Sequence, residues 1–284
     1  MASILDKYGI KEVCDFTFYE ISEETGNPTN PVLYLDTLKV STVEQSGDES
    51  EARGGKGNSL LLIWDTNKEL TVNLEDALFS AKSMAIMFGN GRVKNYSGEN
   101  AYIMRTEQFT ATAEAASLPK EGTSSAGWEA KYEGPDGKLY PKVNPKFYDE
   151  NGNTVTNLKK GTKYFCTYDL KVENGSVIEI SANTFPGVYY CTGDTFARSQ
   201  LSGKDEAFQL IIPKAKVQSE NTITMEAEGD PSTFNMNLRV MRCDDGSMMK
   251  LVKYSLAAGA EVSESESANL IHNHSLNPVT QASG

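Results

Sequence analysis

The chain has 284 residues, of which 39% are hydrophobic and 23% are charged, and its formal net charge at pH 7 is −12. A chain of this length folds as one large domain or two smaller ones and has enough apolar residues for a real core. The acidic balance argues against a protein that coats nucleic acid, because that function needs clustered Lys and Arg to neutralise phosphates. The ordinary role of such acidity is solubility.

The cysteines are too far apart for a zinc knuckle or a redox pair, since no two of them lie within four residues of each other. We expect free, buried thiols from a reducing compartment. Residues 1–12 lack the apolar segment of a signal peptide, and no apolar run is long enough to span a membrane, so we expect neither feature. The cysteines are Cys14, Cys166, Cys191 and Cys243.

The first elements are predicted to be strands. Residues 1–12 are polar and are expected to form an N-terminal arm. From Cys14 to Tyr19 apolar and polar residues alternate, which predicts a half-buried strand. Residues 23–31 have the composition of a turn, and residues 32–43 are predicted to form one long strand.

Residues 45–58 are charged and rich in glycine, and we predict a mobile loop that becomes ordered against a neighbour. The run Gly54-Gly55-Lys56-Gly57 resembles a phosphate-binding loop. However, no Ser or Thr follows the lysine, and the next element is predicted to be a strand rather than a helix whose N-terminus could hold an anion. A nucleotide site is therefore not expected here.

A strand–strand–helix unit follows the glycines. Residues 60–64 are continuously apolar and predict a buried strand, and residues 70–74 alternate as a second strand. Ser80 is a good N-cap and Gly89 a natural C-cap, so residues 81–88 should form a short helix. The residues predicted to face the core are Ala81, Met84, Ala85 and Phe88, and Met84 and Met87 are interpreted as core filler.

The middle of the chain is predicted to hold a β insertion over residues 138–185. A strand is expected over residues 101–112, and residues 113–138 lack any periodicity and are interpreted as a long excursion. Asn151-Gly152 is a hairpin signal. Tyr164, Cys166, Tyr168 and Leu170 alternate as a strand, and residues 177–182 are predicted to continue as another after a turn.

The last third returns to long strands. Residues 188–198 predict one strand, and Phe208, Leu210 and Ile212 predict another that ends at Pro213. The alternation in residues 223–227 and 234–240, around a turn at residues 228–232, predicts a hairpin. A final strand is expected over residues 248–254. Residues 257–284 are polar and are expected to be disordered when alone.

No constellation for chemistry is found, so we expect a protein that is not an enzyme and that holds no metal or cofactor. The two histidines, His272 and His274, lie in the polar tail, which argues against metal binding and against a Ser-His or Cys-His nucleophile. The short basic clusters lack interleaved aromatic residues, so a nucleic-acid groove is not expected. The candidate carboxylate pairs are Glu75 with Asp76, Asp205 with Glu206, and Glu228 with Asp230, and each is interpreted as a strand end or turn.

Three stretches resemble the tail tube (major tail) proteins of tailed bacteriophages. The runs Lys204–Val217 (KDEAFQLIIPKAKV) and Met225–Phe234 (MEAEGDPSTF) are similar to the C-terminal half of those proteins. The run Lys68–Ser80 (KELTVNLEDALFS), which leads into the short helix, is similar as well. The resemblance leaves out the insertion and the tail.

The resemblance implies a mainly β fold, namely a tail-tube-type β-sandwich or barrel with one short flanking α-helix. The residue pattern predicts, in addition, a small, Ig-like β-sandwich insertion. It implies hexameric rings of the chain that stack around a DNA channel, through which DNA passes without specific binding. Further partners would be other tail proteins (sheath or terminator, tape measure), and no membrane is expected. The protein would belong to the virion tail after assembly in the cytoplasm of the host bacterium.

The predicted organisation is a discontinuous tube domain (1–137 and 186–256), an inserted β subdomain (138–185) and an extended C-terminal arm (257–284). The contact with other copies is predicted for Gln45, Asp48, Glu49, Glu51, Arg53, Gly54, Gly55, Lys56, Gly57 and Asn58.

Two alternatives stay open. One is another phage structural role, as a tail terminator or capsid decoration protein. The other is a carbohydrate-binding, adhesive β module, suggested by the aromatic residues Tyr164, Tyr168, Tyr189 and Tyr190.

Overall fold

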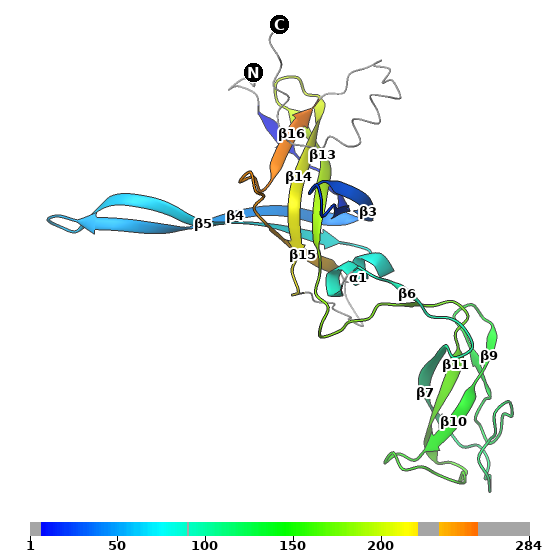
Figure 1. Cartoon of the computed structure of the whole chain (residues 1–284). Helices are drawn as coiled ribbons and strands as arrows, with labels where there is room; N and C mark the ends of the chain where they lie inside the picture. Colours follow the sequence, from blue (N-terminus) through cyan, green and yellow to red (C-terminus); the bar gives the residue numbers. More distant parts are fainter. Residues whose placement is uncertain (1–6, 90, 221–232, 255–284) are drawn as a thin grey trace, which may run out of the picture. The chain divides into compact units, whose positions relative to one another are not determined.

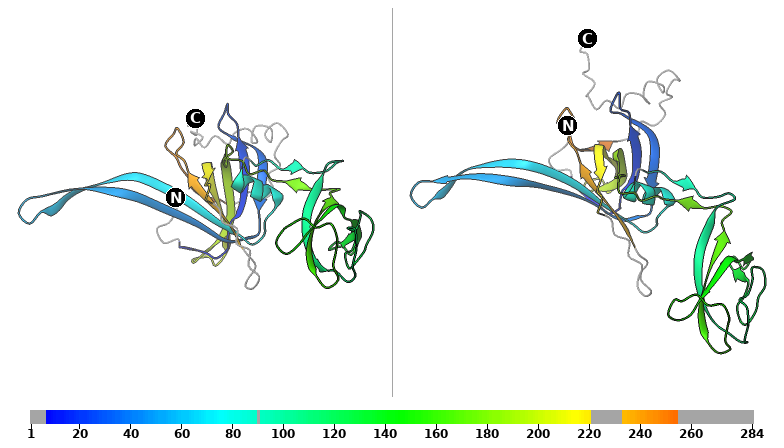
Figure 2. Two further views of the ribbon diagram at one scale, coloured as in Figure 1. Left: turned by 90° about the horizontal axis from the view of Figure 1, so that it is seen from below. Right: turned by 60° about the horizontal axis from the view of Figure 1, so that its bottom comes forward.

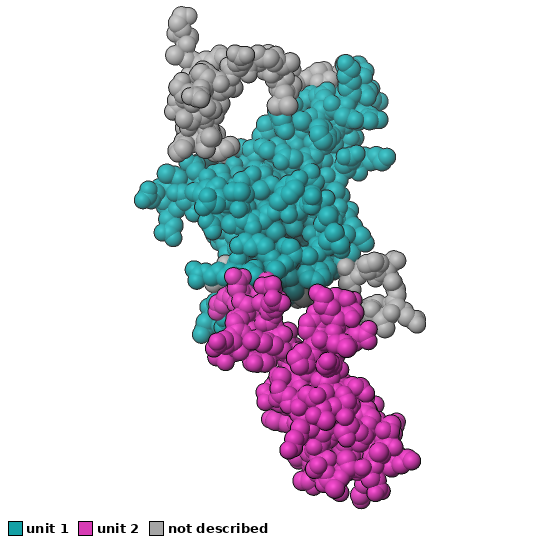
Figure 3. Space-filling view, turned by 90° about the vertical axis from the view of Figure 1, so that its right-hand side faces the viewer, with its two compact units in different colours: residues 1–93, 178–284 teal, residues 94–177 magenta. Residues whose placement is uncertain are grey.

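A computed structural model describes residues 7–89, 91–220 and 233–254 (Figure 1). Over these ranges the protein is mainly β, as the sequence predicts, and contains one short α-helix. The chain divides into two compact units (Figure 3), unit 1 with residues 1–93 and 178–284, and unit 2 with residues 94–177. Within the described ranges, no helix is long and apolar enough to cross a membrane.

Unit 1 is built on a nine-stranded antiparallel sheet with the order β3-β2-β13-β14-β15-β5-β4, in which β1 also pairs with β13 and β16 with β14. Its elements are β1 (Tyr8–Ile10), β2 (Asp15–Ile21), β3 (Pro28–Leu35), β4 (Leu38–Gly54), β5 (Ser59–Asp76), α1 (Ala81–Phe88), β13 (Val188–Ser199), β14 (Asp205–Val217), β15 (Phe234–Val240) and β16 (Lys250–Tyr254).

The sheet curls until its two edges meet. Strands β3 and β4 stand at opposite ends of the strand order, yet only Asp36 and Thr37 connect them. Three Cα steps reach at most about 11 Å, so the two edges must come together at this corner. The corner is tied down by Thr37, whose hydroxyl donates to Asp76 Oδ1 (2.5 Å) and whose carbonyl accepts the N–H of Ala77 (3.1 Å).

The curled sheet encloses one apolar core, to which β2, β3, β4, β5, α1, β13, β14 and β15 all contribute (Figure 2). The alternation predicted for two strands is confirmed, since Phe16 and Phe18 of β2 and Val72 and Leu74 of β5 are buried in it. One face of each strand is therefore covered by the core, and the polar residues between them point the other way.

Helix α1 has the predicted bounds and caps. The Ser80 hydroxyl accepts the N–H of Ser83 (3.0 Å), and the Ser83 hydroxyl accepts the N–H of Ser80 (2.9 Å), which closes a reciprocal capping box. The predicted core face is wrong in part. The buried residues are Ser83, Ala85, Ile86 and Met87.

The face that packs is rotated away from the predicted one. Ser83, Ile86 and Met87 have the three-and-four spacing of one helix face, and Ile86 and Met87 belong to the core. The N–H groups of Gly89 and Gly91 both donate to the carbonyl of Ala85 (3.0 Å each) and end the helix. Ala81 is exposed, and Met84 and Phe88 are half-buried.

Some predicted strand limits are also wrong. Residues 32–43 do not form one strand, because the chain turns at Asp36 and Thr37 between β3 and β4. Strand β14 continues through Pro213. On one side β14 pairs with β16 up to Ile211 and with β15 from Ala215, and Pro213 lies in the gap where its missing N–H breaks no ladder. The predicted strand 223–227, the turn that follows it and the predicted C-terminal segment 257–284 lie outside the described residues.

Unit 2 contains a three-stranded sheet (β10-β11-β7), the β8–β9 hairpin and a short β6–β12 ladder at its ends. Its core is aromatic, with Trp128, Phe147, Cys166 and Tyr168 buried. Its strands are β6 (Lys94–Asn95), β7 (Tyr102–Thr110), β8 (Lys131–Glu133), β9 (Leu139–Pro141), β10 (Val143–Tyr148), β11 (Lys163–Lys171) and β12 (Ser176–Val177).

The limits of unit 2 differ from the predicted insertion at residues 138–185. The unit starts at residue 94 because β7 pairs with β11 along its whole length, from Tyr102↔Lys171 to Thr110↔Lys163. The stretch 113–138, interpreted as an excursion, supplies the buried Trp128 and strand β8. At the other end, residues 178–182 are not a strand.

The four cysteines are free, as the sequence predicts. Cys14, Cys166 and Cys191 are buried, and Cys243 is half-buried. Burial raises the pKa of the Cys191 thiol well above its usual value and that of Cys166 to about 12. These thiols stay protonated at neutral pH and act as small apolar groups.

Candidate functional site

The feature of unit 1 that does not serve its own core is the far end of the β4–β5 hairpin (Figure 1). The two strands pair from Leu38↔Asp76 to Gly54↔Ser59. The near part of the pair belongs to the sheet, whereas the far part extends beyond it. We call residues 48–66 the arm.

The two halves of β5 are buried very differently. In the near half, Leu70, Val72 and Leu74 are buried and alternate with half-buried polar residues. In the arm, the five consecutive residues Leu60, Leu61, Leu62, Ile63 and Trp64 are exposed by 41%, 61%, 57%, 49% and 51%. The prediction that residues 60–64 form a strand is confirmed, and the prediction that this strand is buried is wrong.

A β-bulge separates the two halves. Between the pairs Ser46↔Glu69 and Asp48↔Thr66 there is one residue on β4 and there are two on β5. Asn67 takes up the extra length in a left-handed conformation (φ 50°), and its side-chain amide donates to Asp48 Oδ2 (3.0 Å). Bulges of this kind bend a hairpin and increase its twist, so Asn67 sets the direction in which the arm leaves the sheet.

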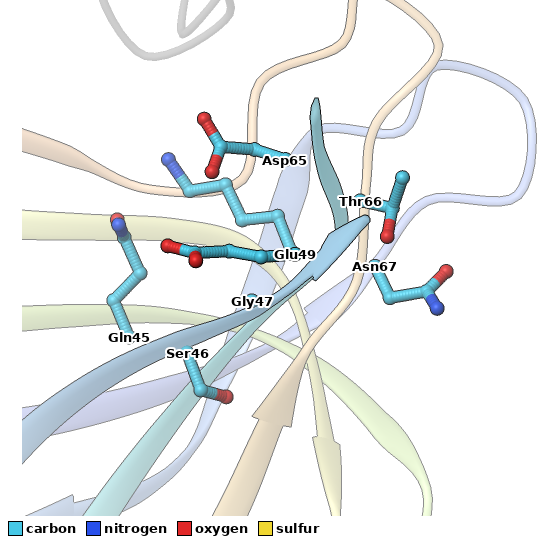
Figure 4. A pocket seen from close by; sticks show the side chains of 8 residues that line it. Gln45, Ser46, Gly47, Glu49, Asp65, Thr66 and Asn67 are labelled. Atoms are coloured by element: carbon cyan, nitrogen blue, oxygen red, sulfur yellow. The ribbon is translucent and has the colours of Figure 1, made fainter. Parts of the chain in front are cut away.

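The bulge also forms a hollow of about 600 Å³ at the base of the arm (Figure 4). Glu49 and Asp65 are directly opposite each other in the ladder, and Figure 4 shows both carboxylates on the same side of the hairpin. Like charges in this position destabilise a hairpin unless a cation approaches them. The residues that line the hollow are Gln45, Ser46, Gly47, Glu49, Asp65, Thr66, Asn67 and Lys68.

The glycines that resemble a phosphate loop form the tip of the arm. Gly55, Gly57 and Asn58 all have positive φ angles (78°, 87° and 50°), and the N–H of Asn58 donates to the carbonyl of Gly55 (3.2 Å). Glycine adopts such angles at little cost, which explains why the tip is rich in it. These residues close a hairpin.

The residues predicted to contact other copies all lie on this hairpin, but in a different conformation from the one predicted. Gln45, Asp48, Glu49, Glu51, Arg53 and Gly54 are on β4, and Gly55, Lys56, Gly57 and Asn58 form the tip. The predicted mobile loop is therefore wrong, because β5 provides a backbone partner along β4. The prediction also missed Leu60 to Trp64, whose apolar run indicated burial within the chain.

The remaining candidates for chemistry have structural contacts. Asp76 is buried and accepts from Thr37, Asp205 forms two bonds with the Arg198 guanidinium (2.7 and 2.8 Å), and Glu206 pairs with Lys253. The bonds from Arg198 hold the pKa of Asp205 below its usual value. Glu228, Asp230, His272 and His274 lie outside the described residues.

Two further kinds of site can be checked over residues 7–89, 91–220 and 233–254. No group of three or more His, Cys, Asp or Glu side chains that could hold a metal ion occurs there. The aromatic residues that suggested an adhesive module, Tyr164, Tyr168, Tyr189 and Tyr190, are all buried, so none of them offers a ring to a ligand at the surface.

A comparison with protein families gives a match over most of the chain. The model of the YomU/Tube protein family matches residues 8–252, a span that runs from β1 into β16 and includes the arm and unit 2. No curated protein matches the chain.

Proposed function

Because the chain belongs to the YomU/Tube protein family, a family of phage-associated tube proteins, we propose that it is a non-enzymatic subunit of a tailed-phage tail tube. In this proposal hexameric rings of the chain stack into a hollow conduit for DNA delivery. The observation that carries the proposal is the exposed apolar arm. A tube subunit must present surfaces that are completed only by other copies, and the arm is such a surface.

The β5 strand of the arm is apolar on both faces, which favours burial between two surfaces. Side chains alternate along a strand, but the register shifts by one residue at Leu61, between the pairs Ala52↔Leu62 and Arg53↔Leu60. Leu62 and Trp64 therefore lie on one face, and Leu60 and Ile63 lie on the other. A strand with one covered face alternates apolar and polar residues, whereas a continuous apolar run is typical of strands covered on both faces. We propose that the arm of one copy enters between two neighbouring copies.

The size of the arm supports contact on both faces. Its seven ladder pairs, from Asp48↔Thr66 to Gly54↔Ser59, make it about 24 Å long at 3.4 Å per residue. With a width of about 10 Å, one face offers roughly 240 Å², against about 800 Å² that each partner buries in a stable interface. One face of the arm is therefore too small for a stable interface on its own. Even both faces together need further contacts from the body of unit 1, as in a ring where every copy repeats the same contacts.

The opposed acids at the base of the arm also favour a neighbour. Lys68 of the same chain lines this hollow and brings one positive charge to the two acids. A Lys or Arg from an adjacent copy would bring the second, since an opposite charge offsets the repulsion between Glu49 and Asp65. Such a contact would determine how two copies align with each other and would add little affinity.

The acidic charge suits a conduit for DNA. Six copies at −12 each would give a ring of −72. A lumen of this sign would repel DNA and let it slide, the reverse of binding by counterion release. We therefore propose that DNA passes without specific binding. Electrophoresis of DNA with assembled tubes should show no retardation at low salt, and strong retardation would contradict this part of the proposal.

Electron microscopy of the purified full-length protein tests the function. We expect tubes or stacked six-fold rings, with a mass per ring of six chains by light scattering. Single rings that never stack would favour a tail terminator, and attachment to capsids alone would favour a decoration protein. A protein that stays monomeric at high concentration would overturn the proposal.

A further inference from the structure

Unit 2 carries a cleft of about 590 Å³ that the arm and the tube proposal do not use. It lies among the edge strand β7, the end of β11 and the turn of the β8–β9 hairpin, which contribute Ile103, Leu170 and Asp136 respectively. Sites for small molecules typically have about 300–1,000 Å³, so the cleft is large enough for a ligand.

Two tyrosines on the β8–β9 hairpin line the cleft, and charged groups hold both hydroxyls. Tyr132 and Tyr140 are directly opposite each other in the ladder. Arg105 lies over the ring of Tyr132 (4.5 Å to the ring centre) and donates from Nη1 to its hydroxyl (2.7 Å). Tyr140 is exposed, and its hydroxyl donates to Asp136 Oδ2 (2.8 Å). The rings are thus held in place before any ligand arrives, which lowers the entropy cost of binding.

The sequence of the turn fixes this arrangement. A Cβ atom at Gly134 would lie 2.8 Å from both Asp136 Oδ1 and Tyr140 Cε2, so only glycine lets these two groups close over the turn. Gly137 has a φ of 74°, which completes the turn at little cost. The Tyr140 hydroxyl and the Lys138 N–H hold the pKa of Asp136 below its usual value, so it stays a carboxylate acceptor.

The charges around the cleft cancel. Two basic residues, Arg105 and Lys171, and two acidic residues, Asp136 and Glu173, line it together with apolar residues such as Ile103. A charged ligand would meet repulsion from one pair, whereas a neutral sugar has hydroxyls that both donate and accept. Its apolar C–H face can pack on a tyrosine ring, which offers an apolar body beside a polar tip.

We propose that this cleft binds a neutral glycan of two or three sugar rings. The exposed ring of Tyr140 forms the packing surface, and Arg105, which lies over the ring of Tyr132, hydrogen bonds with the sugar hydroxyls together with Asp136. The proposal does not depend on the tube function, and it assigns unit 2 a role in recognition.

Saturation-transfer NMR and calorimetry on the full-length protein test the cleft, with maltotriose, cellotriose and N,N′,N″-triacetylchitotriose as probes. At least one probe should give a saturable titration. Tyr140→Ala should weaken binding about fivefold or more because it removes the packing surface. Tyr132→Ala should also weaken binding, because Arg105 loses the ring and hydroxyl that hold it in place. Tyr34→Ala, which removes an exposed tyrosine of unit 1, should leave binding unchanged.

Asp136→Asn changes the cleft but keeps both tyrosine rings. The variant should still weaken binding, because it replaces a carboxylate that only accepts hydrogen bonds. Its thermal unfolding shows whether the variant is folded, which separates a loss of binding from misfolding. The proposal is overturned if none of the three probes binds or if the cleft variants bind like the wild type. Binding of trigalacturonate alone would overturn the neutral class of ligand, and binding of a peptide alone would overturn the glycan.

Discussion

Strand β5 is one continuous strand with two different patterns. From Leu70 to Leu74 apolar and polar residues alternate, and the apolar ones are buried in the core of the same chain. From Leu60 to Trp64 every residue is apolar, and all of them are exposed. The bulge at Asn67 lies between the two patterns.

The residue pattern of a strand therefore indicates how many of its faces are covered, but not which chain covers them. The near half has one face on the core, and its pattern agrees with the structure. The β5 strand of the arm has the pattern of a strand covered on both faces, yet the described part of its own chain covers neither. The two halves should therefore differ in what they stabilise, and under the proposed function the arm stabilises the contact with another copy.

Removal of the arm should have the largest effect. Replacing residues 47–68 by Asn-Gly closes the near ladder at the pair Ser46↔Glu69 with a dipeptide suited to a two-residue hairpin turn, and it leaves the core intact. We expect a folded monomer that forms no tubes in electron microscopy. Normal tubes from this variant would show that the arm is not an assembly element, and loss of the cooperative thermal transition would show that it stabilises the body instead.

The two faces of the arm can be tested separately. We expect Leu62→Glu with Trp64→Glu to abolish assembly, and Leu60→Glu with Ile63→Glu to abolish it as well, because each pair places charge on one covered face. Leu201→Glu is the matched control, since Leu201 is an even more exposed leucine (81%) in a turn of the same unit. Light scattering gives the assembled fraction. If one pair assembles normally, the arm is covered on one face only.

The near half should determine stability instead of assembly. Leu74→Ala removes a side chain that is 1% exposed and should lower the free energy of unfolding by about 2–5 kcal/mol. Leu62→Ala in the arm should change it by less than about 0.5 kcal/mol, because the side chain contacts mostly water in the monomer. Urea denaturation of the unassembled protein measures both. Equal losses would mean that the arm packs on its own chain.

The sequence predicts best what depends on local residues. The caps Ser80 and Gly89 bound the helix correctly, because a cap satisfies groups within one turn. The arm was missed because β4 is rich in Gly, Ser and Glu, which have low strand propensity, and becomes a strand only through its pairing with β5. The start of unit 2 was missed for a related reason, since the pair Tyr102↔Lys171 joins distant parts of the chain.

The candidate site was predictable only in part. Charge and glycine mark residues 45–58 as a segment that no core requires, and these residues lie on the β4–β5 hairpin, while their contact with other copies stays a prediction. The exposure of Leu60 to Trp64 could not be predicted, because apolar residues are buried in the same manner by a neighbour as by their own chain. The tyrosines of the unit 2 cleft gave no signal either, since a hairpin turn brings Tyr132 and Tyr140 together only in three dimensions.

The bulge that joins the halves should show the smallest effect. Asn67→Ala keeps the chain length but loses both the bond to Asp48 and a residue that tolerates a left-handed conformation, at a cost of about 1–2 kcal/mol. Because neither half of β5 changes, the core should stay intact, while the direction in which the arm leaves the sheet should vary more. We therefore expect slower tube growth in time-resolved light scattering, with tubes of normal width once formed.

Asn67→Gly is the control, because glycine restores the conformation without the bond. If both variants grow equally slowly, the bond to Asp48 directs the arm, and if only the alanine variant is slow, the backbone conformation does.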